Sequence, residues 1–222
     1  MERRRREYER YSPVFWRPAA DVTALHARFL RGQLGAGQVI ALRSEHGFII
    51  CQRRPGEGLV DDFTVEPPQS WDEHGAALLL AAAERLAAAG TRAVRVVTAH
   101  ADEAKARLLA RLSLSVTEQW WVRAVAPAGP PSDPGRVRGP GFSGLLTPAP
   151  PVYDPGGPVF YADRMTPGTL AAEVEQAAAA HGAVLAVVPA APGTDRAREL
   201  SAAGWSVAPD WYTGWPAAPD DG

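Results

Sequence analysis

The chain has 222 residues, of which 46% are hydrophobic and 22% are charged, and its formal net charge is −2. This composition is typical of a globular protein and excludes the strong basic excess of most nucleic-acid-binding proteins. The sequence contains no run of about eighteen apolar residues, so no membrane span is predicted. The single cysteine, Cys51, permits no intrachain disulfide. We therefore expect a cytoplasmic protein that binds neither nucleic acid nor a membrane.

Residues 1–11 carry a run of arginines that no apolar signal segment follows, and they predict a flexible basic tail. Residues 12–126 show alternating and helical periodicities typical of one α/β domain. The expected elements are a strand at 13–17, a helix at 20–34, antiparallel strands at 38–43, 47–53 and 58–65, a helix at 75–89, a strand at 93–98, a helix at 102–112 and a strand at 114–123.

Residues 127–140 are dense in proline and glycine and predict a linker. Residues 141–215 then predict a second, shorter domain, and residues 216–222 predict a disordered tail. The expected elements of the second domain are strands at 141–147 and 158–164, a helix at 170–180, a strand at 183–188, a helix at 195–203 and a strand at 206–214.

The second domain repeats the end of the first one. Residues 84–121 and 175–212 align at an offset of 91 positions, and their identical pairs include Val96/Val187, Arg107/Arg198 and Trp120/Trp211. The chain also contains no asparagine, and Lys105 is its only lysine. This bias resembles the product of a GC-rich bacterial genome.

The order of strand, polar loop, helix, strand, helix and strand after an antiparallel meander resembles the GCN5-related N-acetyltransferase (GNAT) family. Residues 59–123 carry this resemblance, through the V-x-P segment Val65-Glu66-Pro67 and the helix start Ala77-Leu78-Leu79. Gly204-Trp205 stands where the family has Gly-Phe. The resemblance implies an α/β (α+β) fold, in which helices flank a mixed, mostly antiparallel sheet. It also implies a tandem arrangement with a second, truncated GNAT-like repeat at 141–215.

The resemblance further implies acetyl-CoA as cosubstrate, held where a strand feeds a helix through a loop whose backbone N–H groups bind the pyrophosphate. Only Gly75 keeps a glycine of the family's loop pattern, because Ser70 and Glu73 replace two other loop residues. Asp72 and Glu73 bring negative charge to that helix start. The residues implied to contact the coenzyme are Phe63, Val65, Ser70, His74, Gly75 and Ala76.

A general base for an amine acceptor is expected among Asp61, Asp62 and Glu66, which lie on or directly after the same strand. The tyrosine that many family members use as the acid is replaced by Leu109, and by Leu200 in the second half. No histidine or cysteine pair has metal-ligand spacing, so no metal is expected.

These observations are compatible with two functions, one enzymatic and one not, and the sequence does not decide between them. The first is transfer of acetyl from acetyl-CoA to a primary amine of an unidentified acceptor. The second is a non-catalytic GNAT-like protein that has lost the coenzyme site and serves as a protein-interaction or small-ligand-binding module. A homodimer is compatible with either function.

Overall fold

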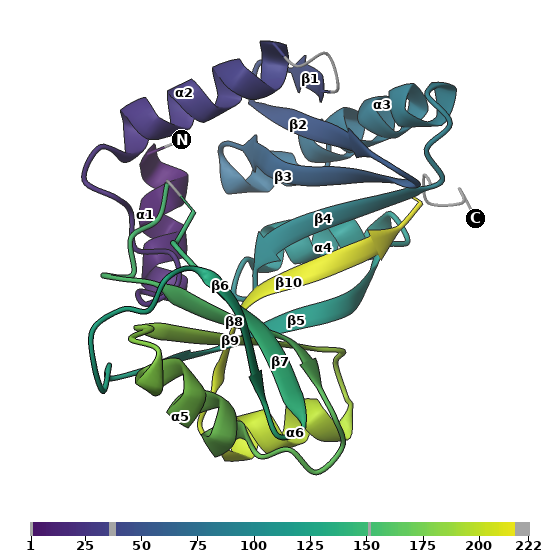
Figure 1. The fold of residues 1–222 in the computed structure, drawn as a ribbon. Helices are drawn as coiled ribbons and strands as arrows, with labels where there is room; N and C mark the ends of the chain where they lie inside the picture. Colours follow the sequence, from purple (N-terminus) through teal and green to yellow (C-terminus); the bar gives the residue numbers. More distant parts are fainter. Residues whose placement is uncertain (1, 36–38, 151, 216–222) are drawn as a thin grey trace. The chain divides into compact units, whose positions relative to one another are not determined.

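Antiparallel strands followed by alternating helices and strands make up both halves of the chain (Figure 1). The computed structural model describes residues 2–35, 39–150 and 152–215. The elements in chain order are α1 (Glu2–Tyr11), α2 (Val22–Gly35), β1 (Val39–Arg43), β2 (Gly47–Arg54), β3 (Glu57–Val65), η1 (Pro68–Trp71), α3 (His74–Ala88), β4 (Ala93–Ala99), α4 (Glu103–Arg111), β5 (Ser115–Ala124), β6 (Gly135–Gly139), β7 (Phe142–Thr147), β8 (Val159–Met165), α5 (Ala171–Ala180), β9 (Leu185–Ala190), α6 (Asp195–Ala202) and β10 (Ser206–Gly214).

The backbone groups into two units with separate interiors. Unit 1 consists of residues 27–117 and the chain from Asp210 onward, and unit 2 consists of residues 2–26 and 118–209. The predicted linker at 127–140 therefore lies inside unit 2, and the chain passes between the units within β5 and β10. The assignment of 12–126 and 141–215 as two GNAT-like domains remains a prediction about the two sequence halves.

Unit 1 is built on an antiparallel meander of β1, β2 and β3, followed by β4, which pairs parallel to β3. β4 in turn has β10 as its neighbour. Helix α3 packs on β1, β2 and β3, because its alanines and leucines form one continuous apolar face. The buried residues of this core include Leu79, Leu86, Val60 and Leu109.

Unit 2 repeats this pattern with β6, β7 and β8 as the antiparallel meander and with β9 parallel to β8. Strand β5 pairs antiparallel to β9. The main core of unit 2 includes Phe160, Val174, Val188 and Leu200, which come from β8, α5, β9 and α6. The order α5, β9, α6, β10 thus matches the order α3, β4, α4, β5 of the first half.

Most of the predicted elements are confirmed within a few residues, and three predictions are wrong. Residues 13–17 form turns instead of a strand, since the N–H groups of Phe15 and Trp16 both donate to the carbonyl of Ser12. Residues 2–11 form helix α1, where a flexible tail was predicted. Residues 135–139 of the predicted linker form strand β6, which pairs with β7. The predicted tail at 216–222 lies outside the described residues.

Candidate functional site

The pairing of β3 with β4 ends halfway along the two strands. Its register covers Glu57–Val60 against Ala93–Val96, although β3 continues to Val65 and β4 to Ala99. The register of β2 against β3 shifts between Ile50 and Cys51, so Asp61 is the extra residue of a β-bulge on β3. Unit 1 therefore has a splay at the carboxyl ends of two parallel strands, which is where open α/β sheets bind ligands.

Unit 2 has the same splay between β8 and β9. Their pairing covers Val159–Tyr161 against Leu185–Val187, and a register shift of β7 against β8 lies between Ser143 and Leu145. Counted from the last paired residue of each strand, Asp163 of β8 occupies the position of Asp62 of β3. The correspondence between the halves therefore extends from the element order to this local distortion.

The predicted coenzyme contacts Phe63 and Val65 have buried side chains in the core of unit 1. The ring of Phe63 packs against the indole of Trp71 from η1, with 4.8 Å between the ring centroids. Trp71 is itself 2% exposed. Because these side chains face the core, Phe63 and Val65 present only backbone groups to a ligand in the splay.

Gly75 is a glycine for a reason that the sequence did not indicate. A Cβ atom added at this position would lie 2.8 Å from Leu108 Cδ2 and 2.8 Å from Trp71 Cε3. The missing side chain therefore makes room for two core side chains. This clash explains the glycine by core packing and gives no support to a role in letting a phosphate approach the backbone. The N–H group of Gly75 still belongs to the first turn of α3.

The start of α3 is less negative than the sequence suggested. Arg111 of α4 donates to the carbonyl oxygen of Asp72 over 2.5 Å and lies 3.4 Å from its carboxylate. Glu73 is exposed and makes no side-chain cap to the helix. The ring of His74 packs against that of His46, with 4.2 Å between the centroids. Asp72 is thus neutralised, and two imidazoles stand beside the helix start.

The other predicted loop residues lie in the same segment. Ser70 is half-buried, and its N–H group donates to the carbonyl of Pro67 over 2.9 Å. Ala76 is partly buried in the first turn of α3, where the N–H groups of the first residues have no acceptor within the helix. His74, Gly75 and Ala76 therefore supply the donors that a helix start offers to an anion.

Lys105, which is not among the predicted site residues, reaches into the splay of unit 1. Its side chain is buried, its Nζ donates to the carbonyl of Val97 over 2.8 Å, and it lies 5.4 Å from the ring centroid of Phe63. It thus contacts β3 and β4 beyond their last paired residues. The spacing of Lys105 with Leu108, Leu109 and Leu112 places it on the apolar stripe of α4, a signal present in the sequence.

His100 and Asp210 of unit 1 form a hydrogen-bonded histidine–carboxylate pair. The distance from His100 Nδ1 to Asp210 Oδ2 is 2.8 Å, with the imidazole half exposed and the carboxylate buried. The hydrogen bond that His100 donates to Asp210 raises the pKa of His100, burial opposes this, and the negative charge of Asp210 adds to the increase. His100 directly follows β4, so the pair stands at the carboxyl end of a splayed strand.

The predicted bases Asp61, Asp62 and Glu66 lie along the other splayed strand. Asp61 is exposed at the bulge, Asp62 is half-buried, and Glu66 is half-buried with its N–H donating to the carbonyl of His46 over 2.7 Å. Asp61 and Asp62 thus lie on β3 beyond its last residue paired with β4, and Glu66 directly follows the strand.

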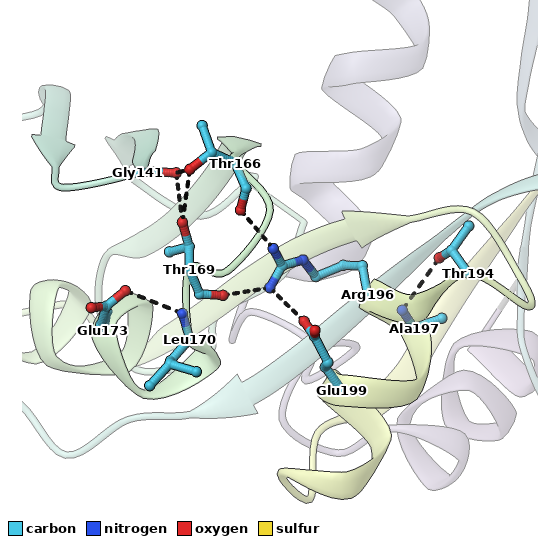
Figure 2. A network of polar contacts seen from close by, with 9 residues as sticks. All are labelled: Gly141, Thr166, Thr169, Leu170, Glu173, Thr194, Arg196, Ala197 and Glu199. Atoms are coloured by element: carbon cyan, nitrogen blue, oxygen red, sulfur yellow. Dashed lines mark hydrogen bonds and ion pairs between the residues drawn. The ribbon is translucent and has the colours of Figure 1, made fainter.

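In unit 2, side chains of the loop between β8 and α5, together with an arginine of α6, hold that loop in place (Figure 2). The hydroxyls of Thr166 and Thr169 donate to the carbonyl of Gly141 over 3.0 and 2.9 Å. Gly141 has φ +77°, and an added Cβ would collide with both hydroxyls. Arg196 of α6 donates to the carbonyls of Thr169 and Thr166 over 2.6 and 3.0 Å. Glu173 accepts the N–H of Leu170 at the helix start, so this loop meets its own hydrogen-bonding needs.

No group of three or more histidine, cysteine, aspartate or glutamate side chains in residues 2–35, 39–150 and 152–215 is arranged to hold a metal ion. Within the same ranges, every helix is too short or too polar to cross a membrane.

The sequence matches no family model and no curated protein. Solved structures match it by fold. A candidate acetyltransferase from Thermoplasma acidophilum has a TM-score of 0.59 at 12% identity, covering 88% of this chain and 86% of that chain. A second one, from Pyrococcus horikoshii, has a TM-score of 0.51 at 11% identity, covering 98% and 89%. A GCN5-related N-acetyltransferase from Sphaerobacter thermophilus has a TM-score of 0.49 at 12% identity, covering 86% of each chain. The mixed α/β fold predicted from the sequence, that of the GNAT superfamily, is thereby confirmed.

Proposed function

We propose that this chain, which has the GNAT fold, is an acyltransferase that moves acetyl from acetyl-CoA to a primary amine. The observation that carries the proposal is the His100–Asp210 pair at the carboxyl end of β4, beside the splay of β3 and β4. A half-exposed imidazole held by a buried carboxylate is a suitable general base, because its Nε2 is left free to accept a proton.

The coenzyme would bind to unit 1 through backbone groups. The N–H groups of His74, Gly75 and Ala76 would meet its pyrophosphate at the start of α3, with Ser70 in the preceding loop. Phe63–Val65 would pair with the pantetheine arm, since this part of β3 has no strand partner in β4. Neutralisation of Asp72 by Arg111 supports an anion at this position.

His100 would take one proton from the ammonium form of the acceptor. The amine nitrogen then bonds to the thioester carbonyl carbon, the C–S bond breaks, and the second amine proton goes to the departing thiolate. The ammonium of Lys105 in the splay would stabilise that negative charge in place of the tyrosine that Leu109 replaces. Asp61, Asp62 and Glu66 are alternative bases, and His100 is preferred because Asp210 fixes its ring.

In the second half, we propose a GNAT-like repeat that does not hold a coenzyme. The support is the loop of Figure 2, in which Glu173 already accepts the N–H of Leu170, a donor at the helix start that would otherwise face a pyrophosphate.

A non-catalytic function is the second candidate, and a specific observation favours it. Trp71 fills the space above Gly75, and the buried Lys105 occupies the splay between β3 and β4. In this alternative, these side chains replace the coenzyme, and the fold serves as an interaction or small-ligand-binding module.

Thermal unfolding of the full chain with acetyl-CoA tests both candidates. Ligand at a hundred times its dissociation constant stabilises the native state by about 2.7 kcal/mol, a rise in Tm on the order of 5–10 °C. With a panel of amines, release of free coenzyme thiol measures turnover. His100→Gln should reduce turnover roughly 10²–10⁴-fold and keep the Tm shift. His181→Gln, which changes a histidine of unit 2, is the control. No Tm shift up to millimolar acetyl-CoA would establish the second candidate.

A further inference from the structure

The outer face of the β6–β7–β8 meander carries an arginine-rich hollow that the proposed function does not use. The hollow is open to solvent and has a volume of about 740 Å³. The polar side chains among its lining residues are Arg136, Arg138, Ser143, Asp163, Arg164 and Thr166. Three arginines against one aspartate give it a net positive charge.

Strand register places the central residues of the hollow in one row. Arg138 of β6 is the partner of Ser143 of β7, and Ser143 is the partner of Arg164 of β8. Directly paired residues share a face of the sheet, and neighbouring strands are about 4.8 Å apart. The two arginines therefore flank Ser143 on one face, with backbones roughly 10 Å apart. Their long side chains can reach one anion lying over Ser143.

This face is opposite to the one that α5 covers. Phe142 and Leu146 alternate with Ser143 along β7, and both are buried in the core that includes Val174 of α5. The residues that form the row thus point away from that core.

The charges in the hollow are only partly balanced. Arg136 lies 2.8 Å from Asp163 Oδ2, and Ser143 donates to Asp163 Oδ1 over 3.0 Å. Burial raises the pKa of Asp163, but the hydrogen bonds from Arg136 and Ser143 outweigh it and lower the pKa. Asp163 is thus an anion that neutralises Arg136. Within residues 2–35, 39–150 and 152–215, the guanidinium groups of Arg138 and Arg164 have neither an ion-pair nor a hydrogen-bond partner.

We propose that this hollow is a binding site for a small molecule carrying a phosphate monoester, held between Arg138 and Arg164. Two unneutralised guanidinium groups match the two charges that such a group carries above pH 7. Each guanidinium is a planar fork that donates two parallel hydrogen bonds to phosphate oxygens. Arg136 and Ser143 are fixed by Asp163, so the floor of the site is organised before the ligand arrives.

Calorimetric titration of the full chain with inorganic phosphate and with glucose 6-phosphate, at constant ionic strength set with NaCl, tests this site. We expect a dissociation constant of about 1 mM or tighter. Arg138→Gln and Arg164→Gln should each weaken binding by about tenfold or more. The matched control is Arg28→Gln/Arg92→Gln, which removes two exposed arginines of unit 1 that likewise have no partner among the described residues.

Three results would overturn the proposal. The first is no binding at 10 mM of either probe, and the second is an equal loss of affinity in the control variant, which would indicate net charge alone. The third is binding to vesicles of phosphatidic acid, or to a single-stranded oligonucleotide, without binding to the two soluble probes. Because the titration uses no coenzyme, it succeeds or fails independently of the acyltransferase activity.

Discussion

The Nδ1 atom of His100 lies 2.8 Å from Oδ2 of Asp210, although 110 positions separate the two residues in the sequence. His100 ends strand β4, and Asp210 belongs to the neighbouring strand β10. The pair therefore depends on a strand from the far end of the chain. Its carboxylate is buried and its imidazole is half exposed, so the orienting group is protected while the reactive group stays accessible.

The first prediction concerns the pH dependence of this pair. Because Asp210 raises the pKa of His100, Asp210→Asn should lower it and move the acidic limb of the kcat/KM profile to lower pH. The native pKa lies above the unfolded one, so this contribution to stability is present below the unfolded pKa and is lost as pH rises through the native pKa. The titration of the His100 ring by NMR measures the shift directly.

Asp163→Asn is the control for this prediction, since it removes a carboxylate from unit 2 and should leave the His100 titration in place. An unchanged His100 midpoint in Asp210→Asn would show that the hydrogen bond does not set its basicity.

The second prediction concerns Gly75. Gly75→Ala should lower the free energy of unfolding by about 1–3 kcal/mol, because the new Cβ meets Leu108 and Trp71 at 2.8 Å. Gly32→Ala, a substitution in α2 with open space around the new atom, should instead stabilise the protein by up to about 1 kcal/mol. Chemical denaturation measures both changes. Equal effects of the two substitutions would contradict the packing role of Gly75.

A third prediction compares two arginines of helix α6. Arg196 is largely buried and donates to the carbonyls of Thr166 and Thr169, so Arg196→Ala should cost about 1.5–3 kcal/mol of unfolding free energy. Arg198 is exposed and pairs with Asp195 within its own helix, so Arg198→Ala should cost less than about 1 kcal/mol. If the two variants unfold at the same denaturant concentration, Arg196 does not fasten the loop.

The fourth prediction concerns Cys51, which is buried on strand β2. Burial raises the pKa of its thiol to about 12, so almost no thiolate forms near neutral pH. Ellman's reagent should give no colour with the native protein and one equivalent per chain after denaturation, because Cys51 is the only cysteine. Rapid colour without denaturant would reveal opening of β2.

The sequence carried enough information for most of the fold. Alternation along 47–53 and 58–65 and the alanine-rich helix at 75–89 reflect burial, which is a local pattern that periodicity detects. Strand β6 was missed because its arginine and glycine residues bury little apolar surface and so give no hydrophobic pattern. Its pairing with β7 is what makes it a strand. Helix α1 was missed for a similar reason, since none of its side chains is fully buried.

The candidate site was harder to predict because its parts meet only in three dimensions. The strand that carries Asp61 and Asp62 was predicted from its alternating pattern, whereas His100 gave no signal without Asp210. Gly75 was recognised as a special residue, but its reason is the volume of Leu108 and Trp71, which no local motif records. Spacing alone could have identified Lys105, since it interrupts the apolar stripe of α4.

The division of the chain between the two units also sets the order in which they can be completed during synthesis. Residues 118–209 all belong to unit 2, yet unit 1 includes Asp210 and the residues after it. On the ribosome, β4 therefore waits for its neighbour β10 until the whole of unit 2 has been made. During that interval the nascent chain exposes the unpaired backbone groups of a sheet edge, the kind of surface on which chains aggregate.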